Sequence, residues 1–320
     1  MTEIQAARPH AAVHSIDHFA LNVPSVADAA RFYRAFGLGV ETSDDGTELE
    51  LRAADGHRWA RILPAAAKSL AYLSFNCYAR DFDALARQVE QSGAVRADAP
   101  PGAESGGLWF HDPDGNLLQV RVGPKTSPSP SAKAPHVTVG AGANARGAVM
   151  RSQVQTIHPE RLSHVLLFTP DVLRAIDFYA RAIGLRLSDK SLDIIAFTHA
   201  PHGSDHHLVA FAKSGARGWH HAAWDVRDLD MVGQGAAQMA AAGYTHGWGT
   251  GRHVLGSNYF HYVQDPWGSF NEYSADIDFV AADHPWPAGD FAPEDSLYQW
   301  GPDVPSDFIH NTEAPDSPVH

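Results

Sequence analysis

Two short segments of the chain decide its fold, because the second repeats the first. Residues 16–24 have the sequence IDHFALNVP, and residues 162–170 have the sequence LSHVLLFTP. The histidines His18 and His164 and the two closing prolines coincide at one common offset. Short segments in which apolar residues alternate before a proline are typical of strands. The sequence therefore predicts an internal repeat whose units begin with a strand.

The segment after each proline is repeated as well. Apolar residues recur there at spacings of three and four, which predicts an amphipathic helix in each half. These helices are expected to end at Gly37 and Gly184, because glycine readily adopts the left-handed conformation of a helix cap. Further helices are expected to open at residues 81–83 and 228–230.

A tight turn recurs near the end of each half. The sequence DPDG at 112–115 corresponds to DPWG at 265–268, and in such turns proline fixes φ while glycine relieves the bend. Strand patterns flank both turns, and the order of strand, helix and strands also restarts near Leu70. The sequence thus predicts an α+β fold of four βαβββ modules arranged in two domains.

Shifts in composition divide the chain into segments. We expect an N-terminal extension (1–14), a first domain (15–123), a linker (124–159), a second domain (160–275) and a C-terminal tail (276–320). The linker is rich in Pro, Ser, Ala and Gly, which is typical of a segment with little core of its own. The tail is acidic and proline-rich but keeps aromatic side chains. Because a disordered tail would be poorer in aromatics, we expect it to dock on the second domain.

Charge and cysteine content exclude several classes of function. The 320 residues carry 24 Lys and Arg against 37 Asp and Glu, which gives a formal net charge of −13. This balance, without any basic run, argues against nucleic acid or an anionic membrane as a partner. The single cysteine excludes an internal disulfide. Neither a secretory signal nor an apolar run of membrane-spanning length is recognised, so we expect a cytoplasmic protein.

Three segments of the second half carry a more specific pattern. His164 lies in the opening strand, His221 lies in WHHAAWDV (219–226), and Glu272 lies in SFNEY (269–273). This pattern resembles the vicinal oxygen chelate superfamily and, within it, the two-domain extradiol ring-cleavage dioxygenases. The resemblance implies two tandem domains of the glyoxalase type, the second holding Fe(II) through His164, His221 and Glu272. Two imidazoles and one carboxylate are the ligand set of non-heme Fe(II) oxygenases, and Mn(II) is a possible alternative ion.

The resemblance also implies functional residues beside the metal. His207, the second histidine of a pair with His206, matches the acid-base residue of the family; the alternative is a surface histidine. His253 and Tyr262 match a family signature of GxH followed by a tyrosine, and they would hold the substrate oxygen and the developing charge. Their alternatives are a loop histidine and a core tyrosine. Arg252 is a candidate for binding a substrate carboxylate, with a surface charge as its alternative.

The residues themselves leave one choice open and supply one control. His220 competes with His221 for the ligand role, because neighbours on a strand point to opposite faces; the resemblance favours His221. In the first half, His18, Ser74 and Gln119 are aligned with the three implied ligands. A serine and an amide make a poor site for a divalent ion, so the first domain is expected to be metal-free.

The function implied by the resemblance is extradiol (meta) cleavage of a catechol-type aromatic by O₂, giving a ring-opened semialdehyde or related acid. One alternative is a glyoxalase-like, metal-dependent lyase or isomerase. Another is a non-catalytic, ligand-sequestering protein of the bleomycin-resistance type. The expected partners are a small aromatic diol and O₂, and the chain is expected to form a homo-oligomer. Which catechol or hydroquinone is cleaved, and whether Fe or Mn is used, stays open at this point.

Overall fold

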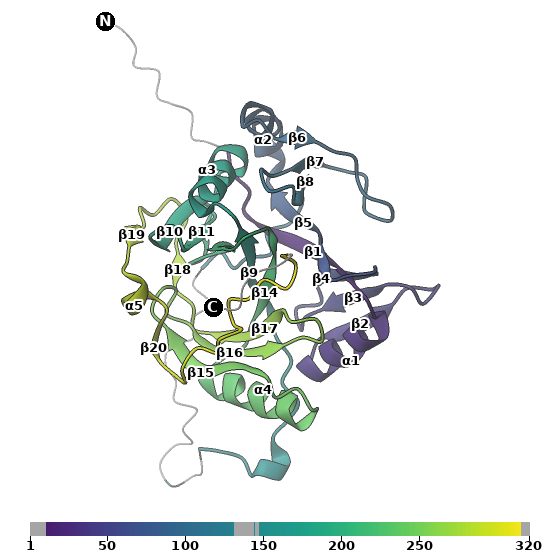
Figure 1. Cartoon of the computed structure of the whole chain (residues 1–320), viewed down its shortest axis with the longest axis vertical. Coiled ribbons are helices and arrows are strands. Elements are labelled where there is room, and N and C mark those ends of the chain that lie inside the picture. The colour runs from purple at the N-terminus through teal and green to yellow at the C-terminus, as the bar shows by residue number, and fades with distance from the viewer. Residues whose placement is uncertain (1–10, 131–143, 145–146, 315–320) are drawn as a thin grey trace, which may run out of the picture.

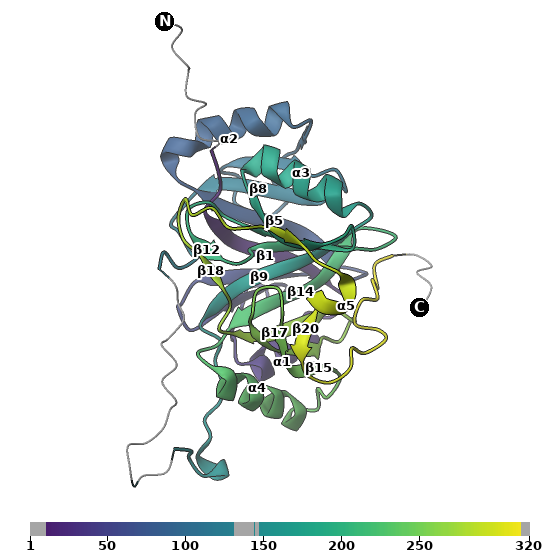
Figure 2. The same ribbon diagram turned by 90° about the vertical axis from the view of Figure 1, so that its left-hand side faces the viewer.

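The computed structural model describes residues 11–130, 144 and 147–314, so parts of the expected N-terminal extension, linker and tail lie outside the described residues. Two large sheets form the centre of the molecule. Helices α2 and α3 lie at one end of it, and α1 and α4 lie at the other (Figures 1 and 2). Within the described residues no helix is long and apolar enough to cross a membrane.

The first sheet is built from two modules of the predicted kind. They consist of β1 (Ser15–Val23), α1 (Val26–Phe36), β2 (Gly39–Thr42), β3 (Leu49–Arg52) and β4 (Arg58–Pro64), then β5 (Ser69–Cys77), α2 (Ala79–Gln91), β6 (Val95–Arg96), β7 (Leu108–His111) and β8 (Leu117–Val122). The strand order is β2-β3-β4-β1-β5-β8-β7-β6. The opening strands β1 and β5 are antiparallel neighbours, so the two modules meet along one seam.

The second sheet repeats this plan. Its modules consist of β9 (Arg161–Thr169), α3 (Val172–Ile183), β10 (Arg186–Ser191), β11 (Ile195–His199), β12 (Ser204–Asp205) and β13 (Val209–Lys213), then β14 (Gly218–Asp225), α4 (Leu229–Ala241), β15 (Gly247–His253), β16 (Tyr259–Gln264) and β17 (Phe270–Ala275). The opening strands β9 and β14 form the seam. The predicted α+β fold of four βαβββ modules in two tandem domains is confirmed.

The tail adds strands to the second domain. It contains β18 (Phe279–Val280), β19 (Gly289–Asp290), α5 (Pro293–Ser296) and β20 (Tyr298–Trp300), whereas the linker contains a short 3₁₀ helix, η1 (Arg151–Gln153). Strand β19 pairs with β10 and β20 pairs with β15, so the tail extends both edges of the second sheet. Strand β18 pairs with β12 in a separate two-stranded sheet. Strands β10 and β15, which would otherwise be the edges of the second sheet, are thereby covered.

The helix ends follow from local chemistry. The Ser25 side chain caps α1 by accepting from the backbone N–H of Asp28, which satisfies one free donor of the first turn. Gly37 ends α1 with φ of +96°, and a Cβ there would lie 1.9 Å from the carbonyl oxygen of Ile157. Only glycine fits this close approach. Helix α2 opens at Ala79, slightly before the predicted start.

The domains share one hydrophobic core. Phe36 stacks on Tyr273 with ring centroids 4.0 Å apart, and the Tyr273 hydroxyl donates to the Phe36 carbonyl at 2.8 Å. At the centre, Phe19 of the first domain lies 4.8 Å from Trp219, at the start of β14. Ile157, near the end of the linker, is also buried in this core. The first domain therefore supports the strand that carries His221 in the second.

Candidate metal centre

The register of three adjacent strands brings the three implied ligands together. His164 on β9 and Glu272 on β17 are both direct neighbours of Ala223 on the intervening strand β14. His221 lies two residues before Ala223, and residues at that spacing share a face of a strand. Long-range pairing thus places on one face three residues that are far apart in the sequence.

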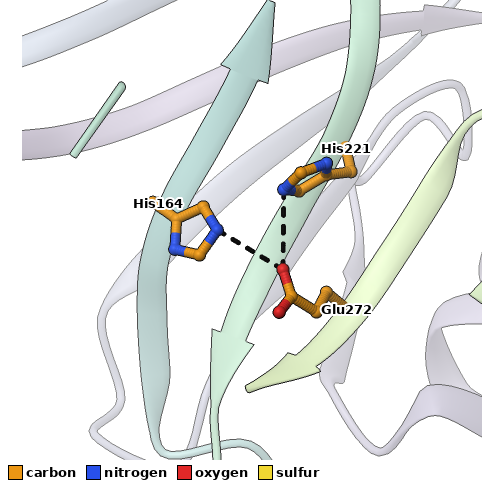
Figure 3. Close-up of side chains that lie close together, drawn as sticks. All are labelled: His164, His221 and Glu272. Carbon is orange, nitrogen blue, oxygen red and sulfur yellow. Dashed lines mark ion pairs between the residues drawn. The ribbon is translucent and has the colours of Figure 1, made fainter. Parts of the chain in front are cut away.

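The ligand atoms of these residues converge on one point (Figure 3). Glu272 Oε2 lies 3.3 Å from His164 Nε2 and 3.5 Å from His221 Nε2. One ligand atom from each of the three side chains lies within 4.8 Å of the others. All three residues are buried, and His221 Nε2 and Glu272 Oε2 have no hydrogen-bond partner. Burying polar atoms without partners is costly, so this arrangement calls for a further group at its centre.

The partner of His164 determines which of its nitrogens faces this centre. The Ser163 hydroxyl lies 3.1 Å from His164 Nδ1 and 3.1 Å from Asp205 Oδ2. The Asp205 carboxylate also accepts two hydrogen bonds from Arg161, at 2.7 and 3.2 Å. Because this carboxylate only accepts, the hydroxyl donates to it and accepts from His164 Nδ1–H. His164 Nε2 therefore presents its lone pair to the centre.

A β-bulge explains the position of His220. Trp219 and His221 pair with consecutive residues of β9, so His220 is the extra residue of the bulge. Bulges re-aim side chains, and both His220 and His221 line the same cavity. His220 Nδ1 lies 2.6 Å from His221 Nδ1, which places His220 behind the candidate ligand. The bulge interrupts the regular alternation of side chains that would have sent His220 and His221 to opposite faces of the strand.

Glu272 is held from the other side. The Asn258 side-chain amide donates to Glu272 Oε1 at 2.9 Å and to the Ser274 hydroxyl at 3.0 Å. Glu272 Oε2 is thereby left for the centre. Two imidazole nitrogens and a carboxylate oxygen converge here, and this donor set fits a divalent first-row metal ion.

The second histidine pair also lies at the centre. His207 follows β12, and its ring centroid is 4.0 Å from that of His164. His207 Nδ1 lies 3.1 Å from His206 Nδ1, and His206 Nε2 lies 2.8 Å from Asp189 Oδ2. Burial, followed by the nearby His164, lowers the pKa of His207 well below its usual value. Asp189 orients His206, and His206 in turn orients the His207 ring.

His253 and Tyr262 form a hydrogen-bonded pair beside the ligands. The Tyr262 hydroxyl lies 2.9 Å from His253 Nε2, and the Leu297 carbonyl accepts from His253 Nδ1 at 2.8 Å. Because a carbonyl only accepts, His253 Nδ1 carries the proton and Nε2 accepts from the tyrosine. Burial and the charge of Glu272 raise the pKa of Tyr262 well above its usual value, so its hydroxyl keeps its proton.

The first domain lacks this arrangement, and its sheet register corrects the sequence alignment. Ser74 pairs with both His18 and Gln119, just as Ala223 pairs with the outer two ligands. Ser74 therefore corresponds to Ala223, and the counterpart of His221 is Tyr72. The Tyr72 hydroxyl lies 2.9 Å from His18 Nε2. The predicted match of Ser74 with His221 was wrong, because the strand register sets the opening strands of the two second modules two residues apart from the predicted alignment.

A cavity of about 260 Å³ opens onto the candidate centre. It is bounded largely by apolar side chains from the second domain and from the tail. These include Leu166, Ile194, Ile195, Phe197, Leu255, Leu297, Phe308 and Ile309. His207, His253 and Tyr262 also line it. Arg252 is not among its lining residues and instead donates to the Tyr259 hydroxyl. The cavity therefore brings His207, His253 and Tyr262 together with the two histidine ligands, and Glu272 lies beside those histidines.

Sequence reasoning missed the groups that orient the ligands. Ser163 and Asn258 contact His164 and Glu272 directly, but serine and asparagine carry no distinctive pattern. The carbonyls of Leu297 and Phe308 bond to histidines of the centre. Every residue has a backbone carbonyl, whatever its side chain. No sequence signal could therefore have identified these two.

The fold and the candidate centre define a class of protein with paired βαβββ domains, of which one carries two histidines and a carboxylate. The model of the glyoxalase/bleomycin resistance protein/dioxygenase superfamily matches residues 15–120 and 161–273. The chain belongs to this superfamily. It is 63% identical over 313 residues to metapyrocatechase 2 of Cupriavidus necator, which covers 98% of this chain and 97% of the relative.

Solved structures share the fold. The Mn(II)-bound glyoxalase from Novosphingobium aromaticivorans matches with a TM-score of 0.70 and 26% identity, over 91% of each chain. An extradiol ring-cleaving dioxygenase from B. fuscum matches with a TM-score of 0.73 and 20% identity, over 94% of this chain and 83% of that one. The second likeness concerns the fold alone.

Proposed function

We propose that this protein is an Fe(II)-dependent extradiol dioxygenase that cleaves a catechol-type diol with O₂. The observation that carries the proposal is the meeting of one ligand atom each from the buried residues His164, His221 and Glu272, of which His221 Nε2 and Glu272 Oε2 have no hydrogen-bond partner. The 63% identical metapyrocatechase relative supports the same reaction class. Mn(II) is the alternative ion, because it accepts the same ligands.

The proposed ligand set leaves coordination positions open for guests. When bound, the ion would supply the redox chemistry and open positions of non-heme Fe(II) oxygenases. The cavity walls around it exclude water and hold the aromatic ring of the diol. The ring is cleaved next to a hydroxyl-bearing carbon, and both oxygen atoms of O₂ enter the ring-opened product.

Three residues of the chain would handle protons and charge. His207 is bound through Nδ1 to His206, so Nε2 is the atom at which it would hold and deliver a proton. The Tyr262 hydroxyl donates to His253 Nε2, and this pair would position a substrate oxygen and stabilise the charge that develops on it. Each role requires the residue to reach the cavity, and all three line it.

The cavity favours a diol without a charged substituent. Among its described lining residues, Lys213 is the cationic side chain apart from the histidines, and it is paired with Asp193. Arg252 does not line the cavity and instead donates a hydrogen bond to the Tyr259 hydroxyl. A substrate carboxylate would be buried against apolar walls without a partner, which is costly. We therefore propose catechol itself or a catechol with small apolar substituents.

The test is anaerobic loading with Fe(II), followed by a panel of neutral and carboxylated catechols with O₂ uptake recorded. The expected result is one O₂ consumed per diol and a coloured ring-opened product, with neutral catechols preferred. Turnover of a substrate without O₂ would instead indicate a glyoxalase-like lyase or isomerase. Retention of a ligand without bound metal would indicate sequestration.

Three further proposals accompany this function. We propose the segment limits expected from the sequence, with the catalytic domain at 160–275 and the tail at 276–320. A homo-oligomer is proposed, and sedimentation velocity measures it directly. The cytoplasmic location stays a prediction that cell fractionation can test.

A further inference from the structure

We propose that His220 and the backbone carbonyl of Phe308 in the tail together fix the tautomer of the metal ligand His221. His220 is then a positioning residue, and the tail is part of the metal centre. This inference rests on the proposed ligand set of the preceding section. It concerns which nitrogen of His221 carries its proton, a choice that decides whether Nε2 can bind a metal.

The geometry fixes the direction of each hydrogen bond. His220 Nε2 lies 2.7 Å from the Phe308 carbonyl oxygen, and a carbonyl can only accept, so His220 Nε2 carries a proton. In the neutral ring His220 Nδ1 is then an acceptor. His221 Nδ1, 2.6 Å away, must donate to it. His221 Nε2 is left with its lone pair directed at Glu272 Oε2, which lies 3.5 Å away.

The surroundings keep the His220 ring in place and uncharged. Its centroid lies 5.0 Å from that of Phe168, 5.6 Å from that of Phe270 and 4.9 Å from that of Phe308. An imidazolium would lose its hydration among these rings. The bulge at His220 brings the ring beside His221, since regular alternation would send the two side chains to opposite faces.

The tail segment that supplies the carbonyl is firmly anchored. The Phe308 ring packs against Trp248 and Tyr262, each with a centroid distance of 4.8 Å. Asn311 is buried and donates to the Ser214 hydroxyl at 3.1 Å. These contacts hold the backbone at Phe308 at a fixed distance from His220.

A buried lysine ties this anchor to the first domain. Lys68 donates to the Glu313 carboxylate at 2.7 Å and to the Trp219 carbonyl at 3.0 Å. The Glu313 carboxylate also accepts from the Trp219 backbone N–H at 2.9 Å. Trp219 directly precedes His220, so one ion pair joins the first domain, the tail and the bulged strand.

The outer partners of the two histidine ligands differ in charge. His164 reaches the Asp205 carboxylate through Ser163, whereas His221 reaches a neutral carbonyl through His220. A neutral acceptor selects the tautomer without adding negative charge behind the ligand. Replacing the outer partner of a metal-bound histidine lowers metal affinity by about 10- to 100-fold.

The first test measures Mn(II) affinity by the electron paramagnetic resonance signal of free Mn(II), without turnover. His220→Phe keeps a ring of similar size but removes the acceptor, and we expect Mn(II) binding weaker by about 10- to 100-fold. His220→Asn places an amide oxygen near the position of Nδ1, and we expect it to recover most of this loss. His261→Phe, outside the cavity, is the matched control and should bind Mn(II) like the unaltered protein.

Affinity of His220→Phe equal to that of the unaltered protein would overturn the inference, as would equal weakening in His220→Phe and His220→Asn. If the unaltered protein does not bind Mn(II) at all, the proposed metal centre itself fails, which is a separate outcome.

The second test uses the unaltered protein, so it does not depend on whether a variant folds. In metal-free protein labelled with ¹⁵N histidine, the nitrogen shifts distinguish protonated from unprotonated ring positions. The inference predicts a proton on Nε2 of His220 and on Nδ1 of His221, with an unprotonated Nε2 in His221. A proton on Nε2 of His221 would contradict it whatever the variants show.

Discussion

The two domains repeat the same order of strands and helices, but within the described part of the chain only the second assembles a candidate metal centre. His18 and Gln119 occupy the positions of His164 and Glu272, and Tyr72 occupies that of His221. His18 Nε2 therefore meets a hydroxyl proton where His164 Nε2 meets a carboxylate oxygen. The first domain thus places a hydroxyl group where the second has a candidate metal ligand.

The charges inside the two sheets differ as well. In the first domain Arg61, buried, lies 3.3 Å from the Tyr72 hydroxyl and also pairs with Glu48. Arg61 pairs with Ala20 across the sheet, as Ala210 pairs with Leu166. A fixed guanidinium thus takes the place of a methyl group. In the first sheet the Arg61 guanidinium provides a positive charge at this place. In the second sheet the equivalent residue is Ala210, which leaves room for a metal ion.

The largest expected effect is loss of the metal from the second domain. His164→Ala, His221→Ala and Glu272→Ala each remove one of three ligands, so bound iron and turnover should both be abolished. Metal analysis and O₂ uptake measure this directly. The matched control is His18→Ala, which should leave the iron content unchanged. Normal iron occupancy in any of the three variants would remove that residue from the ligand set.

A smaller effect is expected where the second domain has a histidine and the first has an arginine. Counting back from the equivalent residues Val209 and Ala60, Arg58 stands in the place of His207. His207→Phe should keep the metal but lose turnover by about 10²- to 10⁴-fold, the usual contribution of an acid-base residue. Arg58→Met should keep both. Unaltered turnover in His207→Phe would assign proton transfer elsewhere.

Acid is expected to weaken the second domain first. Burial lowers the pKa of His199, His220 and His261 in the second domain from 6.5 to about 4. His14, directly before the first domain, has its pKa lowered to the same value, again chiefly by burial. A histidine with a lowered folded-state pKa adds stability that is complete above pH 6.5 and is lost as the pH falls toward 4. Each pKa unit corresponds to about 1.4 kcal/mol, so the loss reaches several kcal/mol.

The first domain holds a buried carboxylate, Asp17, that responds at lower pH. Although burial acts to raise it, hydrogen bonding and charge from His18 lower the pKa of Asp17 to about 2. The stability from this carboxylate is present above its ordinary pKa and is lost only as the pH falls toward 2. Peptide-resolved hydrogen exchange between pH 7 and 4 should show protection lost first in β11, β14 and β16, which carry His199, His220 and His261. Earlier loss in β1 and β5 would contradict this account.

The smallest expected effect is that of a graft that should fail. Tyr72→His with Gln119→Glu reproduces the ligand types of the second domain around His18. We expect the double variant still to bind one metal ion per chain, because the guanidinium of Arg61 stays at the site. Adding Arg61→Ala should allow a second ion. Two ions in the double variant would show that the ligand types alone decide.

The repeat made most of the fold predictable. Matching strands around His18 and His164, and matching turns at 112–115 and 265–268, predicted the four modules. The short strands of the tail escaped, because β19 and β20 are defined by pairing with distant edges and not by a local pattern.

The candidate centre was predictable only in part. The identities of His164, His221 and Glu272 follow from the resemblance, and the strand register brings their ligand atoms together. The bulge at His220 could not be predicted, since it depends on the pairing of β14 with β9. The alignment of Ser74 with His221 failed because the true correspondence, Ser74 with Ala223, follows only from strand pairing. Pairing irregularities leave no mark in a single sequence.

The most direct test of the account is the anomalous difference map of a crystal loaded with Mn(II). The account predicts one peak per chain, within coordination distance of Nε2 of His164, Nε2 of His221 and a carboxylate oxygen of Glu272. A peak beside His18 in the first domain, or the absence of a peak between these three side chains, would contradict it.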